Sequence, residues 1–202
     1  MSTLLQINAS LAGGHGTSSQ LADRFVSDWV AKHPGGHVLK RDLAADPVPH
    51  LTAERFQAFL SKPEARTLEQ QAVSEYSDAL IDEIKAADTV VFAVPMYNFS
   101  VPSTLRAYFD HIARAGVTFR YTSAGPEGLL KGKKVYVFIT RGGIYANGVD
   151  TQTPYLKQFL AFIGLTDVQF VYAEGLGMGE ETREKSLSAA HHAIEELLPY
   201  AA

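Results

Sequence analysis

The sequence predicts a doubly wound α/β fold, with five parallel strands in one sheet and helices on both of its faces. Three observations support this prediction. Short runs rich in Val, Ile and Phe alternate with helical patterns along the whole chain, as they do in successive βαβ units. Two of these runs are apolar on both alternating faces, which is typical of central strands covered by helices on each side. Apolar residues recur at helical spacing between the runs.

Five segments are expected to form the strands. The third and fourth should be buried most deeply, because their Val, Ile and Phe residues occupy both alternating positions. The predicted strands are Thr3–Asn8, His37–Arg41, Asp88–Val94, Lys134–Thr140 and Asp167–Tyr172.

The helices expected between the strands have apolar stripes and recognisable ends. Leu21, Phe25 and Trp29 lie at fourfold spacing in the first helix. Proline is well tolerated at a first helical position, which fits Pro102 and the Thr153–Pro154 pair, where threonine would be the N-cap. The predicted helices are Ser18–Lys32, Leu68–Ala87, a helix after Pro102 that includes Leu105–Ile112, a helix from Thr153–Pro154 that Gly164 closes, and Glu181–Leu198. Pro47–Pro63 is expected to be a long connection, with a short helix within it as one alternative.

The composition predicts one cytoplasmic globular domain over residues 1–202. The chain has 202 residues, of which 46% are hydrophobic, and it contains no cysteine. Disulfides, thiol chemistry and cysteine metal sites are therefore excluded, and any electron transfer must use a bound cofactor. The apolar runs are too short to span a membrane. The net charge is −4 with scattered Lys and Arg, so neither nucleic acid nor a membrane is an expected partner.

Ligands of a doubly wound sheet bind beyond the carboxyl ends of its strands, and the loop after the first strand has a suitable composition. Asn8–Ser18 contains glycines and hydroxyl residues and leads into a helix. Backbone N–H groups and a helix N-terminus favour a phosphate group there. An ordinary flexible loop with a Ser or Thr N-cap is equally compatible. The loop matches neither the nucleotide-hydrolysing pattern with its lysine nor the GxGxxG pattern.

Two further loops lie at the same predicted edge. Pro95–Pro102 combines aromatic residues with an amide, which suits a flat heteroaromatic ring; alternatively, Tyr97 and Phe99 only pack under the loop. The paired glycines of Thr140–Gly143 permit close approach of the backbone to a ligand, although a simple turn would look the same. Together the three loops indicate a ligand site.

Other chemistries have little support in the sequence. His191 and His192 are adjacent, so on a helix they cannot form a zinc pair with i, i+4 spacing, and they are expected to be solvated; no metal site is predicted. Serine hydrolase patterns are absent. Arg114 and Arg120 are interpreted as surface or interface charges in preference to substrate contacts. The apolar stripe from Leu105 to Ile112 is interpreted as core or dimer interface.

Four longer runs form a more specific pattern. They are Pro95–Phe99, Ala113–Thr122, Gly125–Leu129 and Arg141–Gly143, and the tail from Phe159 to Ala173 agrees with them. Together they resemble the family of FMN-dependent NADH:quinone oxidoreductases and azoreductases. The resemblance covers essentially the whole chain, and ordered runs of this length are more specific than a lone glycine motif.

The resemblance implies a flavodoxin-like fold with strand order 2-1-3-4-5, one tightly bound FMN per subunit, and a homodimer in which both chains build each substrate pocket. The apolar face of the helix after Pro102, with Tyr121, is expected in the two-fold interface. The implied FMN ligands are Ser10, Gly16, Thr17 and Ser18 at the phosphate, Pro95, Met96, Tyr97, Asn98 and Phe99 along the ring, and Thr140, Arg141, Gly142 and Gly143 at its polar edge. The implied substrate pocket consists of Tyr121, Tyr145 and Phe162. Many relatives carry a hydroxyl residue where this chain has Gly16, so that contact would come from a backbone N–H group or be lost.

The implied function is transfer of two electrons from NADH or NADPH to a quinone or an azo compound. We hypothesise a ping-pong cycle in which one pocket serves both substrates in turn. The cofactor carries the chemistry, so no catalytic side chain is expected, and N–H groups around Gly142 and Gly143 would stabilise the reduced flavin. The alternative is a flavodoxin-like FMN-binding electron carrier without NAD(P)H turnover. Mild acidity and aromatic residues available to cover the ring favour the enzyme.

Overall fold

A five-stranded parallel sheet forms the centre of the computed structural model, which describes residues 2–145 and 150–198. The strands stand in the order β2-β1-β3-β6-β7, and all neighbouring pairs are parallel. This is the predicted order 2-1-3-4-5, so the fold class is confirmed. The strands are β1 (Thr3–Asn8), β2 (His37–Asp42), β3 (Thr89–Pro95), β6 (Lys134–Thr140) and β7 (Asp167–Ala173).

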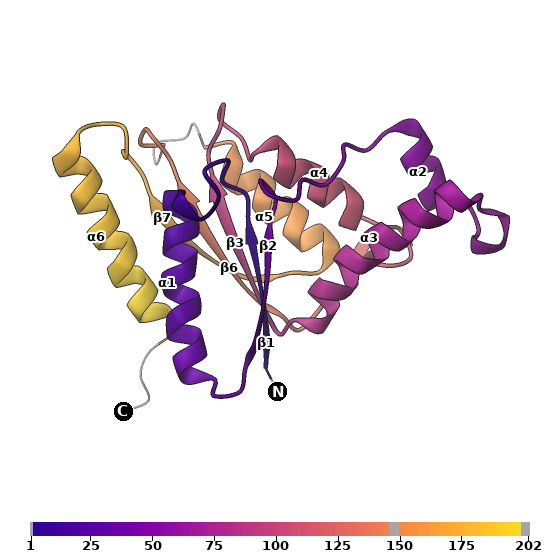
Figure 1. Ribbon diagram of the computed structural model, residues 1–202, viewed down its shortest axis with the longest axis horizontal. Coiled ribbons are helices and arrows are strands. Elements are labelled where there is room, and N and C mark those ends of the chain that lie inside the picture. The colour runs from indigo at the N-terminus through magenta and orange to yellow at the C-terminus, as the bar shows by residue number, and fades with distance from the viewer. Residues whose placement is uncertain (1, 146–149, 199–202) are drawn as a thin grey trace.

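Helices cover both faces of the sheet (Figure 1). One face carries α1 (Thr17–Lys32) and α6 (Glu180–Leu197), and the other carries α3 (Leu68–Ala86), α4 (Ser103–Ile112) and α5 (Gln152–Ile163). The long connection before α3 does contain a helix, α2 (Ala53–Leu60), whose N-cap Thr52 accepts a hydrogen bond from the backbone of Arg55. Among residues 2–145 and 150–198, no helix is both long and apolar enough to cross a membrane.

The core follows the alternation of the two central strands. Every residue of β3 is buried, and so is every residue of β6 after Lys134. Val90, Phe92 and Val94 pack toward α3, α4 and α5, whereas Val91 and Ala93 pack toward α1 and α6. The prediction that these two strands lie deepest is confirmed. Their sequences are apolar at both alternating positions because each face of the sheet is covered by helices.

The apolar stripe of α4 belongs to the core of the chain. Leu105, Tyr108, Phe109 and Ile112 are each 0% exposed, and the ring of Phe109 stacks on that of Phe159 in α5 at 4.1 Å. The expectation that this face lies in a two-fold interface is therefore wrong, because α5 and the sheet already cover it.

A two-stranded antiparallel hairpin follows α4 and was not predicted. It consists of β4 (Phe119–Thr122) and β5 (Gly125–Gly128). The hairpin rests on the C-terminal end of α5, where Gly164 has φ +103° and ends the helix as predicted. A side-chain carbon at Gly128 would lie 2.0 Å from the backbone nitrogen of Gly164. Two glycines therefore allow the backbones of hairpin and helix to touch.

Arg114 also departs from expectation. It is only 5% exposed and donates to the hydroxyl of Ser77 at 2.8 Å, while Asp78 lies 3.3 Å away and the guanidinium stacks over the ring of Phe59 at 4.4 Å. The interpretation of Arg114 as a surface charge is wrong, because this side chain joins α2, α3 and the end of α4. Two related predictions hold, since Arg120 is exposed in an ion pair with Glu127 and both adjacent histidines of α6 are exposed.

Candidate functional site

The loop after β1 ends at an uncapped helix. A short 3₁₀ turn (Gly13–His15) is followed by Gly16, and α1 begins at Thr17 without a side-chain cap. The first N–H groups of a helix have no partner within the helix, and they attract anions. The Ser18 hydroxyl is fully buried and has no hydrogen-bond partner among the described residues. A buried hydroxyl beside free N–H groups fits an anionic ligand that is bound at this point.

Gly16 allows the start of α1 to approach Ser10. A side-chain carbon at residue 16 would lie 2.1 Å from Oγ and 2.5 Å from Cβ of Ser10. Ser10 is 3% exposed, and its hydroxyl accepts a hydrogen bond from the Ala12 N–H at 3.3 Å. Ser10 thus occupies the space that a side chain at residue 16 would need, and its hydroxyl lies against the start of α1.

The loop after β3 makes a tight turn with an unusual backbone. Asn98 and Phe99 have φ values of 49° and 63°, and the flanking Tyr97 and Ser100 exchange backbone hydrogen bonds of 3.1 and 3.0 Å. Positive φ at both central residues is the pattern of a type I′ turn, which asparagine tolerates and phenylalanine rarely adopts. Such a conformation costs about 1–3 kcal/mol per strained residue and persists only where neighbours enforce it. The turn presents Phe99 with 58% of its surface exposed.

Hydrogen bonds join the three loops to one another. The Tyr97 hydroxyl accepts from the Leu11 N–H at 3.2 Å, which connects the first loop to the second. The Met96 N–H donates to the Thr140 carbonyl at 2.8 Å, which connects the second to the third. The hydroxyl of Thr151, just before α5, donates to the Phe99 carbonyl. The three predicted loops therefore form one continuous surface at the carboxyl end of the sheet.

The loop after β6 leaves two of its backbone N–H groups without a partner among the described residues. The carbonyl oxygens of Arg141, Gly142 and Gly143 accept hydrogen bonds from residues 175–177 at 2.9–3.1 Å. The N–H groups of Gly142 and Gly143 have no recorded hydrogen bond within the described parts of the chain. Residues 175–177 therefore bind the carbonyl groups of this loop, and the N–H groups of the two glycines stay available to a ligand.

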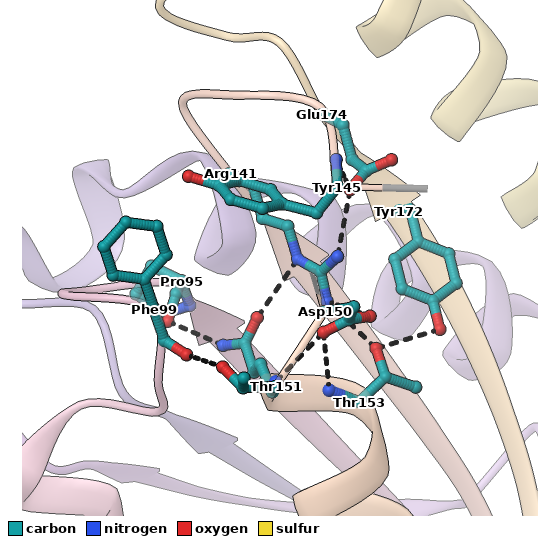
Figure 2. Close-up of polar contacts among 10 residues, drawn as sticks. Pro95, Phe99, Arg141, Tyr145, Asp150, Thr151, Thr153, Tyr172 and Glu174 are labelled. Carbon is teal, nitrogen blue, oxygen red and sulfur yellow. Dashed lines mark hydrogen bonds and ion pairs between the residues drawn. The ribbon is translucent and has the colours of Figure 1, made fainter. Parts of the chain in front are cut away.

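The Arg141 side chain points into the protein (Figure 2). It is 1% exposed and forms ion pairs with Asp150 at 2.8 Å and Glu174 at 2.9 Å. Burial alone would raise the pKa of Asp150, but hydrogen bonds from Thr153 and the Arg141 guanidinium outweigh it, so the pKa lies below its ordinary value. The Arg141 backbone N–H donates to the Ala173 carbonyl at 2.9 Å, so the free donors of Arg141–Gly143, among the described residues, are those of Gly142 and Gly143.

The start of α5 differs from the prediction. Thr151 is the N-cap, whereas Thr153 lies inside the first turn. The Asp150 carboxylate accepts hydrogen bonds from the N–H groups of Gln152 and Thr153 at 2.9 and 3.0 Å, and so replaces the cap. The aspartate two residues before the helix is a recognisable cap signal, and the Thr153–Pro154 pair obscured it.

A groove of about 690 Å³ lies between the first and second loops. This volume is within the usual range for small-molecule sites. Its lining residues include Leu11, His50, Met96, Tyr97, Asn98 and Arg106.

The three residues predicted for the substrate pocket do not meet within one chain. Tyr145 lies at the carboxyl edge, where its ring packs edge-on against Phe99 at 6.0 Å. Phe162 lies in the last turn of α5 and contacts Phe119 of the hairpin at 4.2 Å, and Tyr121 is 75% exposed on the same hairpin. A helix rises 1.5 Å per residue, so the length of α5 separates the two groups by roughly 15 Å.

Fold and site together define a class: flavodoxin-like α/β proteins with an uncapped helix start after β1, an aromatic turn after β3 and a glycine loop after β6, all at the carboxyl edge of the sheet. The family model described as a flavodoxin-like fold matches residues 2–198. The FMN-dependent NADH:quinone oxidoreductase of Cellvibrio japonicus is 56% identical over 97% of this chain and 98% of its own length. That of Alcanivorax borkumensis is 54% identical over 93% and 95%. The chain belongs to the FMN-dependent NADH:quinone oxidoreductase family, within the flavodoxin-like proteins.

Solved structures agree with this assignment. The FMN-dependent NADH-azoreductase of Bacillus anthracis, in complex with FMN, is 29% identical with a TM-score of 0.86, over 98% of this chain and all of its own. The azoreductase AzrA is 27% identical with a TM-score of 0.88, over 97% and 98% of the two chains.

Proposed function

We propose that this chain is an FMN-dependent oxidoreductase that transfers two electrons from NADH or NADPH to quinones and azo compounds in a ping-pong cycle. The expectations of an enzyme and of FMN as its cofactor are confirmed by the relatives, which are FMN-dependent NADH:quinone oxidoreductases at 50–56% identity. The finer points, which are NADPH use, azo acceptors and the order of binding, are proposals. So are a cytoplasmic location and the single FMN-binding domain of residues 1–202.

The observation that carries the proposal is the match between the free polar groups and FMN. The orphaned Ser18 hydroxyl and the uncapped start of α1 suit the phosphate, which is a dianion. The free N–H groups of Gly142 and Gly143 suit the polar edge of a flavin ring. When bound, FMN supplies the two-electron chemistry that no side chain of the protein can perform.

The residues of the chain would then bind FMN, orient its ring and cover it. The first loop would hold the phosphate, and the strained turn of Asn98 and Phe99 would lie along the ring. Donors fixed by the fold stabilise developing negative charge without reorganising during the reaction, which is the role we assign to the Gly142 and Gly143 N–H groups. Tyr145 would form one wall of the substrate pocket.

The purified protein should be yellow, and addition of NADH without oxygen should bleach its flavin absorbance near the visible maximum. Menadione or an azo dye should then restore the colour, because the same pocket admits both substrates in turn. Steady-state rates should give parallel lines in double-reciprocal plots. Flavin that stays oxidised with both NADH and NADPH would identify a carrier, and intersecting lines would rule out the ping-pong order.

We further propose a homodimer. Tyr121 and Phe162 lie at the far end of α5 from Tyr145, so a pocket that includes all three must take two of them from a partner subunit. The interface would include the exposed hairpin residue Tyr121 and not the buried stripe of α4. Light scattering at assay concentrations should give twice the mass of one chain, and an active, FMN-replete monomer would contradict the proposal.

A further inference from the structure

The Arg141 guanidinium joins segments that are far apart in the sequence (Figure 2). Its Nε donates to Gln152 at 3.2 Å, one terminal nitrogen donates to Glu174 at 2.9 Å, and the other donates to Asp150 at 2.8 Å and to Thr153 at 2.9 Å. The rings of Tyr145 and Tyr172 lie 5.7 and 5.4 Å from its central carbon. Four of its five donor positions are therefore directed at fixed partners.

Each partner extends the connection to a part of the candidate site. Gln152 donates from Nε2 to the Pro95 carbonyl at 3.1 Å, at the start of the aromatic turn. Glu174 also accepts from the Tyr145 N–H at 3.1 Å, just beyond the glycine loop. Asp150 fixes the first turn of α5, where Thr151 holds Phe99. One buried side chain thus connects the aromatic turn, the glycine loop and the start of α5.

The charges around Arg141 argue against a direct electrostatic effect on a bound anion. One guanidinium faces two carboxylates, so the cluster carries no excess positive charge. Its geometry is specific, however, because a planar guanidinium presents five donors in a fixed arrangement, whereas an ammonium has three donors on a single nitrogen. Arg141 must then affect ligand binding by holding its hydrogen-bond partners in place.

We propose that Arg141 is a positioning residue. Through Glu174, Asp150 and Gln152 it holds the Gly142 and Gly143 N–H groups at a fixed position relative to the aromatic turn. This inference rests on the proposed FMN site. It assigns Arg141, which the family resemblance places among the residues at the polar edge of FMN, an indirect role.

The test compares Arg141→Lys, Arg141→Met and a matched control, Arg114→Lys. Arg114 is similarly buried and bonded to serine and aspartate, but it lies between α2, α3 and α4. Both Arg141 variants should bind FMN at least tenfold more weakly in a fluorescence titration, and the control should bind it normally. The FMN midpoint potential should fall, because misplaced donors weaken binding of the reduced form more; a tenfold difference corresponds to about 30 mV.

Full rescue of affinity and potential by lysine would overturn the proposal in favour of a purely electrostatic role. Lower thermal stability with unchanged FMN affinity and potential would show that Arg141 only stabilises the fold.

If neither variant folds, a second pair of variants, Glu174→Gln and Glu174→Ala, tests the proposal. Glutamine keeps the accepting oxygen and should retain FMN affinity within about threefold, whereas alanine should lose it. Equal FMN affinities of the two variants would overturn the proposal. These measurements use no NADH, so a chain that binds FMN but is not reduced by NADH fails only the proposed function. A wild-type chain that binds no FMN would overturn both.

Discussion

Gly128→Ala is expected to lower the free energy of unfolding by about 3 kcal/mol, at the upper end of the range for overpacked sites. The added carbon would lie 2.0 Å from the nitrogen and 2.4 Å from the Cα of Gly164, and neither is a flexible side-chain atom that could move aside. Hairpin and helix must then separate, which also breaks the hydrogen bond of 2.9 Å from the Leu130 N–H to the Ile163 carbonyl. Urea unfolding followed by circular dichroism measures the loss.

Gly14→Ala is the matched control for this variant. Residue 14 does not have a positive φ, and a side-chain carbon there would meet nothing within 4 Å, so its unfolding midpoint without FMN should stay close to that of the wild type. In the Gly128 variant the displaced hairpin should also alter the relative efficiencies for different quinones, since it carries Tyr121 and supports Phe162. A Gly128 variant with wild-type stability would show that the close contact with Gly164 is relieved at no cost.

Thr17→Ala combined with Ser18→Ala should weaken FMN binding by at least tenfold. A hydrogen bond to a charged group contributes roughly 1.5–3 kcal/mol, which corresponds to about ten- to a hundredfold in affinity for each hydroxyl that reaches the phosphate. Fluorescence titration with FMN measures the change. Turnover should largely recover when FMN is in excess, because the phosphate is remote from the reacting part of the ring.

The stability of the FMN-free protein distinguishes phosphate binding by Ser18 from ordinary capping of a helix. The Ser18 hydroxyl has no partner among the described residues, so Ser18→Ala should leave the FMN-free protein as stable as before, because it removes a buried, unbonded polar group. Thr52→Ala is the control, since Thr52 does cap a helix; it should cost about 1 kcal/mol of stability and leave FMN affinity unchanged. Unaltered FMN affinity in the double variant would mean that the loop after β1 is not the phosphate site.

Periodic patterns in the sequence predict most of the fold, because burial of a sheet between two helical layers imposes them. β1 and β6 begin and end where the alternation predicts, and the bounds of β2, β3 and β7 differ by at most one residue at either end. Topology then predicts the location of the site, since the carboxyl ends of parallel strands share one edge. The chemistry of the site depends on the resemblance, because glycines and hydroxyl residues are also common in ordinary loops.

The features that sequence analysis missed depend on contacts between distant residues. The β4–β5 hairpin has strands of four residues with Gly125 and Pro126 in the second, so it shows almost no alternation. From the sequence, Arg114 is interpreted as a surface or interface charge, because arginine is usually exposed, and nothing in the sequence indicates the buried ion pairs of Arg141. The hydrogen-bond partners of both arginines are up to 40 positions away in the chain, and only the folded protein brings them together.

The distance between the hairpin and the three loops has a consequence for how proteins of this kind diversify. Residues that would hold the cofactor lie at one end of α5, and the hairpin lies at the other. Tyr121 is exposed on the hairpin and takes no part in the hydrogen bonds that join the loops, so substitutions there should leave those bonds intact. Under the proposed dimer, each chain would therefore keep its own cofactor while its hairpin adapts the acceptor range of its neighbour, so selection can change the two properties separately.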